Sequence, residues 1–150
     1  MAEQGIGKAA ILITPVAPVD CAVKDMRVLF TFANIVLRGD PKQAYKVWKP
    51  GFKWGVVNCV PKERHDDIYS DALYDSGLVY ENLGKPQQDT HTMSVVDESR
   101  ISCPILTIGA TQDRATVIAS VRKVAQKYAR IGGDYKEYDG AGHWIIDEPK

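Results

Sequence analysis

The stretch "PILTIGATQDRATVIASVRKVAQKYARIGGDYKEYDGAGHW", residues 104–144, contains the pattern that decides the fold. It begins with a proline and a β-branched apolar run, Pro104–Ala110, which is typical of a strand buried on both faces of a parallel sheet. Apolar residues then recur at helical spacing over Val117–Tyr128, a pattern that predicts an amphipathic helix. Glycines 132–133 end that helix, and residues 134–138 follow as a second strand. The order strand, helix, strand predicts a parallel βαβ unit.

Each strand of this unit is followed by a polar residue. Asp113 comes shortly after the first strand, and His143 follows the second strand in a glycine-rich turn, Asp139–Gly142. An open α/β sheet places its site at the carboxyl ends of the strands, so the two side chains are candidates for one site. The alternative is an ordinary βαβ unit with a surface aspartate and a histidine in a turn.

The helix predicted over Val117–Tyr128 has a polar side that we expect to face water. Its residues are Arg122, Lys123, Gln126 and Lys127.

Three stretches resemble the α/β-hydrolase family. "GIGKAAILITPVAP", residues 5–18, resembles the sixth strand, and "PILTIGATQDRAT", residues 104–116, resembles the seventh strand with its acid turn. "YKEYDGAGHWIIDEP", residues 135–149, resembles the eighth strand and the histidine loop. The order in that family is nucleophile, acid, histidine. The resemblance implies that Asp113 is the acid and His143 the general base of a catalytic triad.

The nucleophile has no counterpart in this sequence. No serine, aspartate or cysteine stands in a Gly-x-nucleophile-x-Gly elbow, and Ser76 has glycine on one side only. The resemblance therefore covers the second half of the family's fold. It implies a truncated α/β-hydrolase-like protein that hydrolyses a small acyl or related substrate if a partner or missing segment supplies the nucleophile. The alternative is a non-catalytic module, derived from a hydrolase, that binds a small molecule or oligomerises.

We therefore predict the α/β class: one domain, residues 1–150, with a small three-stranded parallel sheet and a helical cap insertion at about residues 16–100. The core strands are expected at 8–14, 104–110 and 134–138. Within the cap, the spacing of apolar residues and the turn signals predict helices over 25–37, 42–47, 65–74 and 76–83, a turn at Pro50-Gly51 and a loop over 85–94. His65 and His91 lie in polar surroundings and are expected on the surface.

Four aromatic residues are candidates to line a pocket for a small apolar ligand, or else to form core: Trp48, Phe52, Trp54 and Trp144. The strand at 8–14 would be bare where its family neighbour is absent, and an exposed apolar edge invites pairing. We therefore expect a homo-oligomer, with a dimer favoured, or pairing with a complementing chain.

Composition limits the remaining classes of function. The formal net charge of zero gives no attraction to nucleic acid or to an anionic membrane. No apolar run reaches the roughly 18 residues of a transmembrane helix, and the first residues lack the pattern of a signal peptide. The three cysteines, Cys21, Cys59 and Cys103, are far apart and form neither a disulfide framework nor a metal motif. We expect a cytoplasmic protein with reduced cysteines that uses no cofactor and no metal.

Overall fold

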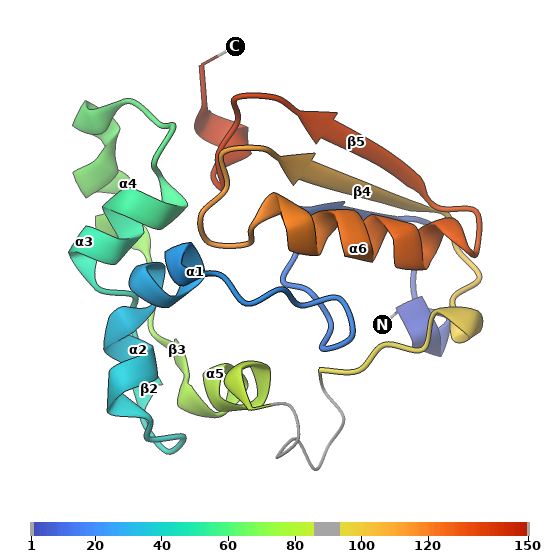
Figure 1. The fold of residues 1–150 in the computed structure, drawn as a ribbon, viewed down its shortest axis with the longest axis horizontal. Coiled ribbons are helices and arrows are strands. Elements are labelled where there is room, and N and C mark those ends of the chain that lie inside the picture. The colour runs from blue at the N-terminus through green and yellow to red at the C-terminus, as the bar shows by residue number, and fades with distance from the viewer. Residues whose placement is uncertain (1, 86–93, 150) are drawn as a thin grey trace.

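The computed structural model describes residues 2–85 and 94–149. Within them, a three-stranded parallel sheet has the order β1-β4-β5, and α6 connects β4 to β5 along one face (Figure 1). This arrangement confirms the predicted α/β class. The strands and the crossover helix are β1 (Ala10–Ile13), β4 (Ile105–Ala110), α6 (Ile118–Ala129) and β5 (Asp134–Tyr138).

The βαβ unit forms because one side of α6 is apolar. Val121, Val124 and Tyr128 are buried on that side, and Val124 and Tyr128 pack in one cluster with Ile105 of β4. After α6 the chain turns at Gly132, whose φ of 82° lies in the region that favours glycine. The strand and helix boundaries agree with the prediction to within two residues.

The predicted exposure of Lys127 was wrong. Its side chain is buried, and its ammonium group lies 2.7 Å from Asp20 and 2.8 Å from Glu98. These carboxylates raise the pKa of Lys127 against the opposing effect of burial. Helical periodicity alone predicted an exposed lysine. It could not reveal the two carboxylate partners, because they lie far from Lys127 in the sequence.

Between β1 and β4 the chain forms short elements that we call the helical segment, residues 26–84. Figure 1 shows that most of this segment lies beyond the carboxyl ends of β4 and β5. Its helices and strands are α1 (Met26–Thr31), α2 (Ala33–Arg38), β2 (Ala44–Tyr45), α3 (Lys49–Gly51), a π-helical turn (Phe52–Val56), a 3₁₀ turn (Lys62–Arg64), α4 (His65–Asp71), β3 (Asp75–Ser76) and α5 (Gly77–Gly84). Short 3₁₀ turns also occur at Ala2–Gln4, Glu98–Arg100 and Ile145–Asp147.

Several predictions for the helical segment were correct. Helix α4 covers most of the expected 65–74, with Asp66 and Asp67 in its first turn, and α5 ends at Gly84 as expected. The helix expected over 25–37 is interrupted at Phe32, which separates α1 from α2. The apolar stripe expected there is largely exposed, and Leu37 is 84% exposed. The periodicity of apolar residues correctly predicted helices here. It could not show that, among the described residues, no element covers most of the apolar side of these helices.

Two predictions between 42 and 51 were wrong. Residues 44–45 pair with β3 in an antiparallel ladder that buries Tyr45, so a strand replaces the expected helix. Pro50-Gly51 lies inside α3 because proline is tolerated in the first turn of a helix. A side chain at Gly51 would place its Cβ 2.2 Å from the carbonyl oxygen of Thr31. Glycine is needed at position 51 because there is no space for a side chain. The prediction had instead taken Pro50-Gly51 as a turn, because this dipeptide is common in turns.

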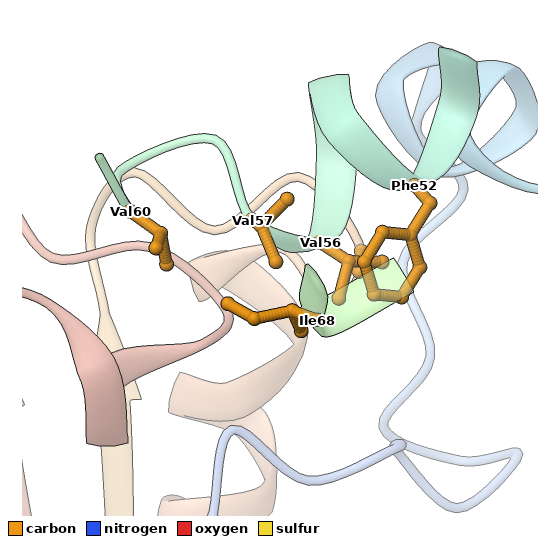
Figure 2. Close-up of a cluster of buried hydrophobic side chains, with 6 residues drawn as sticks. Phe52, Val56, Val57, Val60 and Ile68 are labelled. Carbon is orange, nitrogen blue, oxygen red and sulfur yellow. The ribbon is translucent and has the colours of Figure 1, made fainter. Parts of the chain in front are cut away.

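A buried apolar cluster joins the helical segment to the loop after β4. Figure 2 shows the side chains of Phe52, Val56, Val57, Val60 and Ile68 meeting between the π-helical turn and α4, and Ala115 completes the cluster. Burial of such side chains contributes about 1.5–3 kcal/mol each. The cluster therefore fixes the helical segment against the strand ends.

His65 is buried, and its Nε2 lies 2.9 Å from the carbonyl oxygen of Val60. The prediction of a surface histidine was therefore wrong, because α4 brings this ring against the end of the preceding turn. His91 and most of the loop predicted over 85–94 lie outside the described residues.

Candidate functional site

Asp113 lies in the tight loop between β4 and α6 and is only 1% exposed. Its Oδ1 accepts hydrogen bonds from the backbone N–H groups of Ala115 and Thr116, both at 2.8 Å. These bonds satisfy one side of the carboxylate and fix its orientation. Its other oxygen, Oδ2, is thereby directed at the loop that follows β5.

His143 meets this second oxygen. Its Nδ1 lies 2.9 Å from Asp113 Oδ2, and the histidine side chain is 24% exposed while that of the aspartate is fully buried. Because an ionised carboxylate only accepts hydrogen bonds, this contact favours the neutral tautomer with the proton on Nδ1 and a lone pair on Nε2. No described residue forms a hydrogen bond with Nε2. The structure thus brings the two predicted residues into contact, in a geometry that suits the tautomer a general base uses.

Two threonines that the sequence analysis did not select complete the site. Thr116 Oγ1 lies 2.8 Å from Asp113 Oδ2, 2.9 Å from the carbonyl oxygen of Thr14 and 3.3 Å from His143 Nδ1. Thr14 Oγ1 in turn donates to the carbonyl oxygen of His143 at 3.2 Å. The ends of β1, β4 and β5 are therefore connected through one network. The Asp-x-x-Thr spacing was a usable signal for Thr116, because aspartate side chains commonly bind backbone groups two to three residues ahead.

The backbone at Thr14 is strained. Its φ is 42°, and positive φ is unusual for a residue branched at Cβ. Such strain costs about 1–3 kcal/mol and persists only where the surroundings impose it. Here the hydrogen bonds to Thr116 and His143 hold the residue at the end of β1.

The histidine loop is fixed on its other side by Gly142. Its N–H donates to both carboxylate oxygens of Glu148, at 2.9 and 2.8 Å. A Cβ at this position would lie 2.9 Å from Asn58 Oδ1 and 3.1 Å from Cys59 Sγ, so a larger residue would require these side chains or the loop to shift. Burial raises the pKa of the Cys59 thiol, and the nearby Glu148 acts in the same direction. Such a thiol is poorly ionised at neutral pH.

The apolar cluster of Figure 2 supports both loops of the acid–histidine pair. Ala115, two residues after the acid, is buried within it, and Trp144, directly after the histidine, packs against it. The indole Nε1 of Trp144 donates to Asp147 Oδ2 at 3.0 Å, which fixes the ring. The helical segment therefore helps to position both residues of the pair.

The other aromatic candidates lie in three different environments. Phe52 is in the core, and Trp48 donates through its indole to the carbonyl oxygens of Phe30 and Thr31. Trp54 lines two open depressions. One, of about 330 Å³, is also lined by Pro50, Lys53, Lys62 and His65, and the other, of about 290 Å³, by Met26, Arg27 and Phe30.

The described residues contain no group of three or more histidine, cysteine, aspartate or glutamate side chains arranged to hold a metal ion. Cys21 is buried, and Cys59 and Cys103 are partly buried. Among the helices of residues 2–85 and 94–149, none has the length and apolar character needed to cross a membrane.

Comparison with known proteins supports the fold. No family model and no curated protein matches the sequence. Among solved structures, the chain is similar to the monoacylglycerol lipase of Paleococcus ferrophilus, with a TM-score of 0.57 and 18% identity. The match covers 99% of this chain and 56% of the lipase, so the chain spans little more than half of that protein's length. The lipase is an α/β-hydrolase, and the likeness confirms a hydrolase-like fold.

Proposed function

We propose that this chain carries the acid and histidine of an α/β-hydrolase-like site and hydrolyses a small acyl or related substrate when another polypeptide segment supplies the nucleophile. The observation that supports this proposal is the 2.9 Å contact between His143 Nδ1 and Asp113 Oδ2, with the ring partly exposed. A buried aspartate holding an imidazole in one tautomer is the arrangement that activates a hydroxyl or thiol.

In this mechanism, His143 Nε2 accepts the proton of the nucleophile as it attacks the acyl carbon. Asp113 stabilises the imidazolium that forms, through the hydrogen bond to Nδ1. The histidine then gives the proton to the leaving group, and a second cycle with water releases the acid. The helical segment, as the proposed cap, would shape the entrance for the substrate.

The nucleophile would arrive at the free edge of β1. Within the described residues β1 pairs only with β4, so the backbone groups along its other edge have no strand partner there. A parallel strand added to this edge would end beside Thr14, at the same end of the sheet as His143. We propose that a complementing chain, or a further copy in a homo-oligomer, provides this strand.

The proposal is tested by supplying an external nucleophile. A small thiol such as 2-mercaptoethanol is added with p-nitrophenyl butyrate, and release of p-nitrophenol is compared for the purified chain and for His143→Ala. General-base catalysis contributes about 10²–10⁴-fold, so the substitution should bring thiolysis close to the uncatalysed rate. Asp139→Asn, an exposed carboxylate on the same loop, is the control and should leave the rate unchanged. Equal rates for the chain and for His143→Ala would refute the proposal.

A second candidate function is binding of a small apolar ligand without catalysis. It is favoured by the depression of about 290 Å³ in which Phe30 and Trp54 meet edge to face, with ring centroids 4.8 Å apart. Titration with decanoate should quench tryptophan fluorescence with saturation, and Phe30→Ala should weaken the binding. A linear, non-saturating response would argue against this function.

A further inference from the structure

The two faces of the sheet differ in how they are covered. Val124 and Tyr128 of α6 pack in a cluster that includes Ala10, Leu12 and Ile105. Further along the same face, Arg122 of α6 binds Glu137 of β5. Because side chains alternate along a strand, the residues between these point to the opposite face. In Figure 1, α6 passes in front of β1, on the covered face.

The opposite face, which we call the open face, has an apolar half and a charged rim. Its first two rows contain Ile11 and Ile13 of β1, Leu106 and Ile108 of β4, and Asp134 and Lys136 of β5, and Ala110 and Tyr138 follow on the same face. Ile11 is 63% exposed and Ile13 45%, although both lie in a strand that is apolar throughout. The side chain of Lys136 extends over the ring of Tyr138, 4.9 Å from its centroid, on the same face.

Each strand contributes two of the six residues in the first two rows, and the strand register aligns these rows across the sheet. The register aligns Ile11, Leu106 and Asp134 in one row across the strands. It aligns Ile13, Ile108 and Lys136 in a second row, two residues further along. The point midway between the two rows lies at the same position along all three strands. A twofold axis that passes through these midpoints, perpendicular to the strands and parallel to the sheet, therefore exchanges one row for the other.

A twofold axis in that position would make the open face complementary to itself. When a second copy is placed face to face, about 10 Å away, Ile11 of one copy lies opposite Ile13 of the other, and Leu106 lies opposite Ile108. Asp134 of each copy then lies opposite Lys136 of its partner. The contact is isologous, as in most dimers, and pairs opposite charges on both sides of the axis.

A twofold axis parallel to the strands does not pair the charges in this way. A twofold axis parallel to the strands would place β5 of one copy over β1 of the other. Asp134 and Lys136 would then be desolvated against Ile11 and Ile13, which costs free energy with no charge to compensate. The charge pattern therefore selects one orientation of the second copy.

We propose that two copies of this chain form a symmetric dimer through the open faces of their sheets, with β1 and β4 as the apolar centre and Asp134–Lys136 pairs at the rim. This contact uses a face of the sheet, whereas a complementing strand would use the edge of β1, so both can exist together. It does not depend on hydrolytic activity, because Asp113 and His143 lie beyond the strand ends and do not take part in it.

Charge exchange at the rim tests the proposal by sedimentation velocity over a range of concentrations. Each single substitution, Asp134→Lys or Lys136→Asp, places like charges opposite each other twice in the dimer. It should raise the dimer dissociation constant by about tenfold, given two pairs each worth about 0.2–1 kcal/mol. The double substitution Asp134→Lys/Lys136→Asp restores opposite pairs and should restore the dissociation constant to near that of the original chain. Both positions are exposed, so the substitutions should leave folding unchanged, and circular dichroism of each variant checks this.

A second pair of variants tests the apolar centre. Ile11→Lys should abolish the dimer, whereas Leu37→Lys, on α2 in the helical segment and 84% exposed, should leave it unchanged. A chain that stays monomeric throughout the micromolar range would overturn the proposal. A dimer whose dissociation constant is the same with either single charge substitution would also overturn it, and would point to association through the β1 edge.

Discussion

Replacing Asp113 by asparagine probes the candidate site most directly, because it changes one atom of a buried group. Four donors of described residues lie within hydrogen-bond distance of the carboxylate, two at each oxygen, and the single hydroxyl proton of Thr116 is shared with the carbonyl oxygen of Thr14. In Asp113→Asn the remaining oxygen can keep the two backbone N–H donors. The new amide nitrogen then faces Thr116 Oγ1 and His143 Nδ1, where the carboxylate had accepted.

Both neighbours can adapt. Thr116 can accept from the amide while donating to the carbonyl oxygen of Thr14, which lies 2.9 Å away. His143 can accept only if its proton moves from Nδ1 to Nε2. No hydrogen bond is then lost, but the charge-assisted ones become neutral. Since bonds to charged groups are worth about 1.5–3 kcal/mol and neutral ones about 0.5–1.5, and relief of a buried charge offsets part of the loss, we expect destabilisation by about 1–3 kcal/mol.

Two measurements check this expectation. Urea unfolding followed by tryptophan fluorescence gives the change in the free energy of unfolding, and ¹⁵N shifts of the His143 ring give the tautomer. The original chain should carry the proton on Nδ1 and Asp113→Asn on Nε2. Asp139→Asn should change neither quantity, because Asp139 is exposed and its bond to Thr111 Oγ1 is independent of the pair. An unchanged tautomer, with stability within about 0.5 kcal/mol of the original chain, would refute the reasoning.

Two further predictions concern packing and pH. Gly55→Ala should lower the free energy of unfolding by about 1–3 kcal/mol, because its Cβ would lie 2.0 Å from Thr31 Oγ1, whereas Gly84→Ala meets nothing within 4 Å and should be neutral in the same urea titration. Hydrogen bonding by Arg122 lowers the pKa of Glu137 from 4.5 to about 2, so its contribution to stability is complete above pH 4.5 and is lost as the pH falls toward 2. The free energy of unfolding is therefore measured from pH 7 down to pH 2. Glu137→Gln should be less stable than the original chain by no more than about 1 kcal/mol at pH 7, and this difference should disappear as the pH falls below 4.5. A difference that is independent of pH would contradict this assignment.

The sequence predicted the βαβ unit well because its signals are local and agree with one another. The apolar strand at 105–110, the helical stripe ending at Tyr128 and the glycines after it all favour the same structure. The helical segment was predicted less well. Its elements are short, and a partner distant in the sequence decides each of them. β2 exists because Ala44 pairs with Ser76, and position 51 has no room for a side chain because the carbonyl oxygen of Thr31 lies against it.

The order of the elements, the class of fold and the meeting of Asp113 with His143 at the strand ends could all be predicted from the sequence alone. Residue type and spacing suffice for these, since parallel strands must end on the same side of their sheet. The fold in three dimensions was needed to show that Thr116 and Thr14 join the pair, that Lys127 and His65 are buried, and that Asp134 and Lys136 share one sheet face with Ile11 and Ile13. Each of these depends on strand register or on contacts between residues far apart in the chain, which local sequence does not encode.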